Sequence, residues 1–298
     1  MMLRSLIAPI AAKVVLASSA LAFAQATSDA PVKTGYAPVN GLKLYYEIYG
    51  GGEPLVLLHG GLGSIEMMSS LLPALAKNHE VIAVDLQGHG RTADIDRPIT
   101  YEGMGDDVAA LLEYLGIKQA DLMGYSLGAG TALQATFRHP SVVRKLVVVS
   151  TPFRHDGWYP GVRALMAQMG PASAEQMKPS QLYQTYARIA PRPQDWTRLV
   201  TKMSELINQN YDWSKDVAAI KVPTLLVFGD ADSVPVSHAA EFFELLGGSK
   251  QDGGWDGSGI SNSRLAILPG VTHYNMPVSP ALSEVVLPFL EAPPPTTR

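Results

Sequence analysis

Short apolar runs that alternate with helical stretches constrain the fold of this chain more than any other feature. The runs span residues 55–58, 81–84, 121–124, 146–149, 224–228 and 265–268, and residues 42–49 alternate in the manner of a half-buried strand. The helical stretches between and after them span residues 67–77, 105–115, 127–138, 237–246 and 280–290. Apolar runs bounded by turn residues suit strands that are buried on both faces of a parallel sheet. The alternation therefore predicts an α/β fold with a doubly wound, mostly parallel sheet.

Two stretches interrupt this alternation. Residues 152–215 contain no strand pattern, and they mix aromatic residues and methionines with polar helix formers and prolines. They predict an inserted helical cap, which divides the core into residues 25–151 and 216–298. Most of the apolar side chains of the cap are expected to pack it onto the core, and a few to line a substrate pocket. Residues 247–263 are rich in Gly, Ser and Asp and predict a long surface loop around Trp255.

The N-terminus has the features of an export signal. Arg4 and Lys13 supply positive charge, residues 14–23 are apolar or small, and Ala22-Phe23-Ala24 forms an A-x-A cleavage site. The apolar stretch is too short to cross a bilayer. We therefore expect residues 1–24 to be a cleaved signal peptide. The mature protein would be periplasmic or secreted, without stable membrane insertion.

Composition limits the classes of function. The chain has 298 residues, 47% hydrophobic and 17% charged, which is typical of a soluble globular protein. The net charge is −4 and there is no basic run, so nucleic acid is not an expected partner. The absence of cysteine rules out disulfides, thiolate metal sites and a cysteine nucleophile. Neither a zinc-peptidase nor a nucleotide-binding motif is present, so we expect a small-molecule substrate and no cofactor or metal.

A candidate nucleophile lies in the motif G-x-S-x-G at residues 124–128, with Ser126 at its centre. A predicted strand precedes the motif and a predicted helix follows it. A serine at such a turn adopts a strained backbone that lifts its hydroxyl away from the sheet. The helix N-terminus behind it presents free N–H groups and a partial positive charge to developing negative charge. This context makes the motif far more specific than its letters alone.

A serine hydroxyl needs a base, and a base of this kind needs a carboxylate. His273 is the best-placed base, because it follows the last predicted strand and a Pro-Gly turn. Asp230 and Asp232 both follow the preceding strand, and both are candidates for the carboxylate. The chain order Ser, Asp, His agrees with an α/β-hydrolase triad. The other six histidines lack such a context: His59, His79, His89, His139, His155 and His238.

A glycine-rich turn at residues 59–63 follows the strand at 55–58. Its glycines allow the backbone to curl toward the nucleophile. The backbone N–H groups of Gly61 and Leu127 would then form an oxyanion hole for the tetrahedral intermediate.

Together these residues resemble the α/β-hydrolase superfamily over about residues 39–290. The shared features are the His-Gly turn at residue 59, the segment Asp-Leu-Gln-Gly-His-Gly-Arg at 85–91, the turn at Ser126, the segment Gly-Asp-Ala-Asp at 229–232, and His273. The resemblance implies that the cap is a lid over the site. It also implies that Asp85 and His89 are mainly structural. The chain is similar to capped esterases, lactonases and cofactor-free perhydrolases, and it departs from dehalogenases and epoxide hydrolases, whose nucleophile is Asp.

The resemblance also chooses between the two carboxylates. In the family pattern the acid stands three residues after the strand-ending glycine, and three residues after Gly229 is Asp232. Asp230 would then serve its own turn by accepting local backbone N–H bonds. If neither residue were the acid, Asp156, near the start of the cap, would be the next candidate.

These observations predict a serine hydrolase that cleaves carboxylic esters of small to medium apolar substrates through an acyl-enzyme, with Ser126, His273 and Asp232 as its triad. Three alternatives share the same fold and triad: a peptidase or amidase similar to proline iminopeptidases, a lactonase, and a carbon–carbon bond hydrolase. The peptidase needs an acidic anchor for the substrate amine, for which the sequence offers no clear candidate. A non-catalytic ligand-binding module is an alternative of another class, and turnover of a simple aryl ester separates it.

Overall fold

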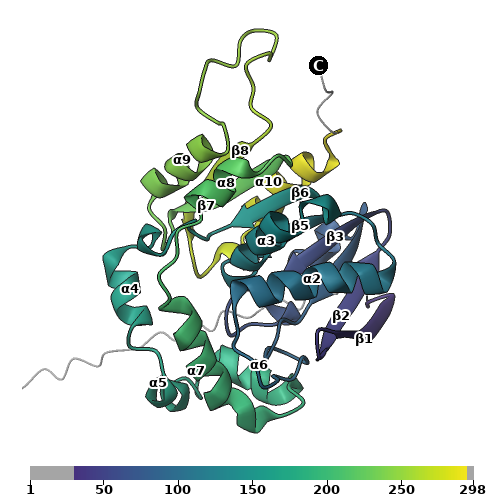
Figure 1. Ribbon diagram of the computed structural model, residues 1–298, viewed down its shortest axis with the longest axis vertical. Coiled ribbons are helices and arrows are strands. Elements are labelled where there is room, and N and C mark those ends of the chain that lie inside the picture. Colours follow the sequence, from purple (N-terminus) through teal and green to yellow (C-terminus); the bar gives the residue numbers. More distant parts are fainter. Residues whose placement is uncertain (1–29, 294–298) are drawn as a thin grey trace, which may run out of the picture.

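The computed structural model describes residues 30–293, which form a twisted eight-stranded sheet covered by helices on both faces (Figure 1). The strand order is β1-β2-β4-β3-β5-β6-β7-β8. The strands are β1 (Lys33–Val39), β2 (Leu42–Gly50), β3 (Glu53–Leu58), β4 (His79–Val84), β5 (Ala120–Tyr125), β6 (Val143–Val149), β7 (Thr224–Ala231) and β8 (Arg264–Thr272).

All strand pairs from β4 to β8 are parallel, whereas β1 pairs with β2, and β2 with β4, in antiparallel fashion. The predicted doubly wound, mostly parallel sheet is therefore confirmed. The sequence of strand β3 is almost continuously apolar because both faces of the strand are buried. Val56 and Leu58 face one buried cluster, and Leu55 and Leu57 face the other, on the opposite side of the sheet. Burying each such side chain contributes about 2 kcal/mol.

Helices cover the two faces unequally. Residues of α2 (Tyr101–Leu115), α3 (Leu127–Arg138) and α9 (Val236–Leu245) belong to the larger buried cluster. Residues of α1 (Leu72–Leu75) and α10 (Pro280–Glu291) belong to the cluster on the other face. The two layers hold the carboxyl ends of the parallel strands at one edge of the sheet, which is where such folds place their sites.

Two elements differ from the sequence-based expectation. The predicted helix at 67–77 is wrong: a 3₁₀ turn at Ile65–Met68 and the short α1 replace it. Pro73 explains the break, because it has no N–H to donate to the carbonyl of the preceding turn. Strand β1 was not predicted, since Gly35 and Pro38 disfavour a strand. It forms as an edge strand on β2, where a proline is tolerated.

Between β6 and β7 the chain is helical. Its helices are α4 (Pro160–Met166), α5 (Pro171–Gln176), α6 (Gln181–Ile189), α7 (Trp196–Ile207) and α8 (Ser214–Ala219). Helices α4 to α7 stand together beside the sheet, whereas α8 lies next to α9 (Figure 1). The predicted boundary at residue 215 therefore falls inside a helix that packs on the core.

The loop at residues 247–263 joins α9 to β8 and projects from the molecule (Figure 1). Trp255 is fully exposed on this loop, so it does not pack against the core. The predicted signal peptide, residues 1–24, lies outside the described residues. Within residues 30–293, no helix is long and apolar enough to cross a membrane.

Candidate active site

Ser126 lies at a sharp turn between β5 and α3. Its backbone has φ 53° and ψ −112°, a conformation that non-glycine residues rarely adopt. The flanking glycines are needed because the chain is crowded there. A Cβ on Gly124 would collide with the backbone of Gly128, and a Cβ on Gly128 would collide with the carbonyl of Leu58. The motif G-x-S-x-G is thus a packing requirement of the turn that carries Ser126.

The structure brings Ser126, His273 and Asp232 together. The Nε2 atom of His273 lies 3.2 Å from the Oγ of Ser126, and its Nδ1 lies 2.9 Å from the Oδ1 of Asp232. The three residues follow β5, β8 and β7, whose carboxyl ends meet at one edge of the sheet. This is the geometry of a nucleophile, a base and an orienting carboxylate.

Four hydrogen-bond donors surround the buried carboxylate of Asp232. Besides His273, they are the backbone N–H of Ser233 at 2.7 Å, the hydroxyl of Ser150 at 2.5 Å and the backbone N–H of Gly229 at 3.3 Å. Burial by itself would raise the pKa of Asp232, but the bonds from His273 and Ser150 outweigh it and hold the pKa below its usual range. Asp232 is therefore an anion that can hold the imidazole of His273 in one orientation.

Neither alternative carboxylate contacts His273. Asp230 is exposed, and its Oδ1 accepts the backbone N–H of Gly270 at 2.8 Å. The prediction of local hydrogen bonds for Asp230 is therefore wrong: its bond crosses from β7 to the Pro-Gly turn of β8. Asp156 is an exposed partner of Arg154.

Three residues that contact or support Ser126, His273 and Asp232 were not assigned to the candidate site from the sequence. Ser150 is fully buried after β6, with φ 54°. The hydroxyl of Tyr125 donates to the carbonyl of His273 at 2.6 Å. The ring of Trp158 meets that of His273 edge to face, with centroids 5.5 Å apart. Tyr125 occupies a variable position of its motif and Ser150 has no motif. Of the three, only Trp158 could have been suspected from the sequence, because it is one of the aromatic residues of the predicted cap, a few of which were expected to line a substrate pocket.

The predicted oxyanion donors are also neighbours. A Cβ on Gly61 would lie 3.9 Å from the Cβ of Leu127, the first residue of α3. Among the described residues, neither of their backbone N–H groups has a hydrogen-bond acceptor. Free N–H groups in the first turn of a helix favour negative charge. The two donors are thus available beside Ser126.

His59 holds the turn that carries Gly61. Its Nε2 accepts the backbone N–H of Leu86 at 3.1 Å, so its Nδ1 carries the proton and donates to the carbonyl of Gly60 at 2.7 Å. Burial lowers the pKa of His59 to about 4, which keeps the ring neutral. The turn is therefore fixed by a histidine that is itself held in one tautomer.

Asp85 has the surroundings of a structural residue. Its carboxylate is fully buried and accepts the backbone N–H groups of Ile65 and Arg91, each at 2.8 Å. His89 follows in the same segment, and burial lowers its pKa to about 3. Among residues 30–293, no group of three or more His, Asp or Glu side chains is placed to hold a metal ion.

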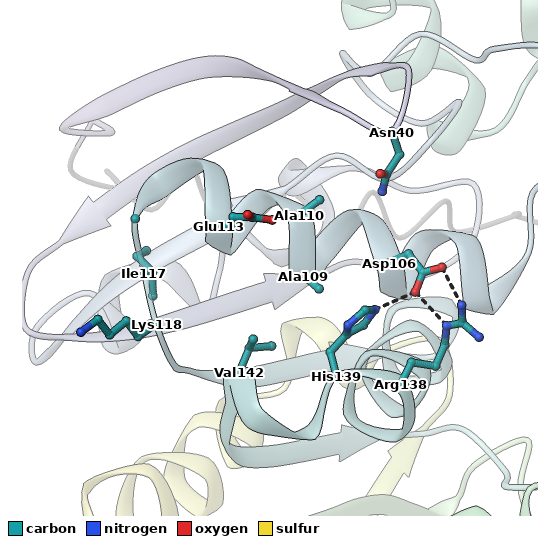
Figure 2. A pocket seen from close by; sticks show the side chains of 11 residues that line it. Asn40, Asp106, Ala109, Ala110, Glu113, Ile117, Lys118, Arg138, His139 and Val142 are labelled. Atoms are coloured by element: carbon teal, nitrogen blue, oxygen red, sulfur yellow. Dashed lines mark hydrogen bonds and ion pairs between the residues drawn. The ribbon is translucent and has the colours of Figure 1, made fainter.

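A surface hollow of about 740 Å³ lies away from these residues, along α2 and the chain that follows α3 (Figure 2). Figure 2 shows Asp106 bonded there to both Arg138 and His139. None of the predicted site residues lines this hollow. The hollow is therefore not a guide to the candidate active site.

Comparison with known proteins agrees with the fold and the arrangement of the site. The sequence profile of the family described as "alpha/beta hydrolase fold" matches residues 53–175. The "AB hydrolase superfamily protein YisY" of Bacillus subtilis is 30% identical over 233 residues, which are 70% of this chain and 84% of that protein. The mouse "Serine hydrolase BPHL" is 28% identical over 236 residues, 76% of this chain and 79% of that protein.

A solved structure shows the same fold. The enol-lactonase from Burkholderia xenovorans matches with a TM-score of 0.64 at 24% identity, over 86% of this chain and all of that chain. The chain belongs to the α/β-hydrolase superfamily, as its sequence predicted. It is a hydrolase of this superfamily.

Proposed function

We propose that this protein is a serine esterase that cleaves carboxylic esters through an acyl-enzyme intermediate. The observation that carries the proposal is the chain of hydrogen-bond distances from Ser126 through His273 to Asp232, beside the two free N–H groups of Gly61 and Leu127. Every group that acyl transfer needs is present within this chain's own residues.

The mechanism follows from the geometry. Ser126 attacks the ester carbonyl while Nε2 of His273 takes its proton, and Asp232 stabilises the resulting imidazolium. The N–H groups of Gly61 and Leu127 bind the oxyanion. His273 then protonates the leaving alcohol, and afterwards activates the water that releases the acid. A preorganised oxyanion donor of this kind contributes about 3 kcal/mol to the stabilisation of the transition state.

An aminopeptidase is less well supported by the structure. Its substrate carries a free amine, which needs a carboxylate anchor that is shielded from water. Between residues 152 and 215, no charged side chain is buried. The carboxylates of this insertion are exposed or, as with Asp195, paired with an arginine. An ester, which carries no charge to be matched, fits this apolar insertion better.

Replacing Ser126 tests the proposal. Ser126→Ala removes one hydroxyl, so the fold is expected to survive while hydrolysis of 4-nitrophenyl butyrate falls by about 10⁴-fold or more. Ser237→Ala, at an exposed position of α9, is the matched control and should keep full activity. Turnover by a folded Ser126→Ala variant at the wild-type rate would refute the assignment. An aminoacyl anilide in the same assay separates esterase from amidase.

We also propose that the protein is exported and acts on small molecules outside the cytoplasm, without nucleic-acid partners. The charged, apolar and small residues before Gln25 support this. Mass spectrometry of the soluble protein from its native host should find an N-terminus near Gln25. An intact Met1 on that protein would contradict the proposal.

A further inference from the structure

Helix α7 of the insertion packs directly on the turn that carries the oxyanion donor. Met203 is 2% exposed, and its terminal Cε methyl lies 3.2 Å from the place where a Cβ on Gly61 would stand. One turn earlier, the Cδ1 of Leu199 stands equally close to the Cβ position of Gly88. Two side chains of α7, Met203 and Leu199, therefore pack against two glycine-containing turns of the core.

A polar cluster around the buried carboxylate of Asp94 fixes α7 in this place, and we call it the Asp94 anchor: Asp94, Arg198 and Lys202. The Oδ2 of Asp94 lies 2.7 Å from the Nζ of Lys202 and 2.8 Å from the Nε of Arg198. Lys202 also donates to the carbonyls of Ile95 at 2.8 Å and Arg97 at 2.6 Å. The side chains of Asp94 and Lys202 are 2% and 14% exposed, so the ion pair between them is largely shielded from water and screened little by salt.

Met203 follows Lys202 in the chain, so the anchor also fixes the backbone that carries the Met203 side chain. Lys202 makes three hydrogen bonds to the core loop, and a side chain held in this way cannot move far without breaking them. A methionine on a free lid would move aside for a large ligand. Here the neighbouring backbone is held, and Met203 can yield only through its own rotamers.

The alcohol group and the acyl group of a bound ester extend in different directions from the carbonyl carbon. The leaving oxygen must approach Nε2 of His273, because that nitrogen returns the proton to it. The alcohol group therefore lies beside the ring of His273, which Trp158 contacts edge to face. The acyl group is one bond from the carbonyl carbon, whose oxygen is bound at Gly61 and Leu127. An acyl group that extends past Gly61, away from His273, would meet the methyl of Met203, which lies beside that glycine.

We propose that Met203 is a specificity-determining residue that blocks long acyl chains, so the enzyme selects esters of short carboxylic acids. The proposal rests on the esterase function proposed above. It assigns the acyl side to Met203 and the alcohol side to the space near Trp158. Chain length in the acid is therefore restricted by α7, whereas chain length in the alcohol is not.

The test uses two substrate series on the full-length protein. One varies the acyl chain of 4-nitrophenyl esters from acetate to octanoate, and the other varies the alcohol of acetate esters. The wild-type kcat/KM should fall along the acyl series. Met203→Ala removes three heavy atoms and should raise the octanoate-to-acetate ratio by about 10-fold or more, because each methylene that a pocket admits or excludes changes selectivity at this scale. The ratio along the alcohol series should stay as it was.

Three further variants complete the test. Met203→Leu conserves volume and should keep the wild-type ratio. Met203→Val should give a smaller shift than the alanine variant, and it serves as the test if that variant does not fold. Met177→Ala, at a partly buried methionine elsewhere in the insertion, should leave both series unchanged.

The two levels of the proposal fail in different ways. If the wild-type protein hydrolyses no ester of either series, the esterase function is refuted, and this inference with it. If esters are hydrolysed but folded Met203 variants keep the wild-type acyl profile, only the role of Met203 is refuted. A shift in the alcohol series instead of the acyl series would also overturn it.

Discussion

At the scale of single residues, the candidate site depends on backbone conformations that residues other than glycine usually avoid. Ser126 and Ser150 both have positive φ, at the carboxyl ends of the adjacent strands β5 and β6. One presents its hydroxyl to His273 and the other to Asp232. Such strain costs on the order of 1–3 kcal/mol per residue and persists because the packed sheet on either side holds it.

The two aspartates after β7 should respond differently to the same substitution. Asp232→Asn removes the charge that holds His273, so turnover should fall by about 10⁴-fold with a small change in melting temperature. Asp230→Asn weakens the bond to Gly270 and should cost about 1 kcal/mol of stability with a much smaller effect on turnover. Steady-state kinetics and thermal melts of both variants check this. The reverse pattern would assign the triad acid to Asp230.

At the scale of elements, the strand–turn–helix unit around Ser126 is built on close backbone contact. Helix α3 passes so near the end of β3 that a Cβ at residue 128 would collide with the carbonyls of Leu58 and His59. The same crossing brings the N-terminus of α3 next to the turn at Gly61. The contact that demands a glycine therefore also brings the two proposed oxyanion donors together.

Gly128→Ala should consequently damage both stability and activity. Relieving the collision requires the backbone of α3 or β3 to shift, with a cost of about 1–3 kcal/mol. Because the shift moves Leu127 relative to Gly61, kcat should fall more than KM rises. Gly161→Ala is the matched control: residue 161 is also a helical glycine, but its Cβ would meet no atom within 4 Å. It should leave activity unchanged and raise stability by about 0.5–1 kcal/mol. Equal melting temperatures for Gly128→Ala and wild type would contradict the argument.

At the scale of the whole molecule, buried neutral histidines make the fold sensitive to acid. Burial lowers the pKa values of His59 and His238 to about 4 and that of His89 to about 3. The unfolded chain protonates these rings below about pH 6.5, whereas the folded protein keeps them neutral until lower pH. At these three rings the unfolded state therefore binds more protons between about pH 6.5 and 4, so their contribution to stability falls as the pH falls through this window. The raised pKa values of the buried carboxyls Asp85 and Asp121, each about 7, act in the opposite direction.

The expected loss is large enough to measure. His59 alone should lower the free energy of unfolding by up to roughly 3 kcal/mol across the window. Denaturant unfolding from pH 7 to pH 4.5 checks this, with proton uptake followed by calorimetry in buffers of different ionisation enthalpy. His59→Gln removes one of the three rings and should make this loss smaller. An identical pH dependence in the wild type and in this variant would contradict the argument.

The fold was predictable from the sequence because its strands and turns are encoded locally. Buried parallel strands need apolar residues on both faces, and the runs at β3 to β7 supply them, whereas β8 is a partly exposed edge strand. Strand β1 escaped prediction because its residues favour no strand by themselves, and only pairing with β2 makes one. The helix predicted at 67–77 failed at Pro73, whose missing N–H outweighed the helical pattern around it.

The residues of the candidate site also fall into those that local sequence predicts and those that only tertiary contacts reveal. The sequence by itself determined the positions of Ser126 and His273, because each has a local context of strand, turn and glycine. Tertiary structure decided what neither local pattern contains. It showed that Asp232 meets His273 while Asp230 reaches Gly270, and it placed Ser150, Trp158 and Met203 around the site. These contacts join residues from separate strands and from the inserted helices. Their distances are set by how the layers pack, and no local pattern records that.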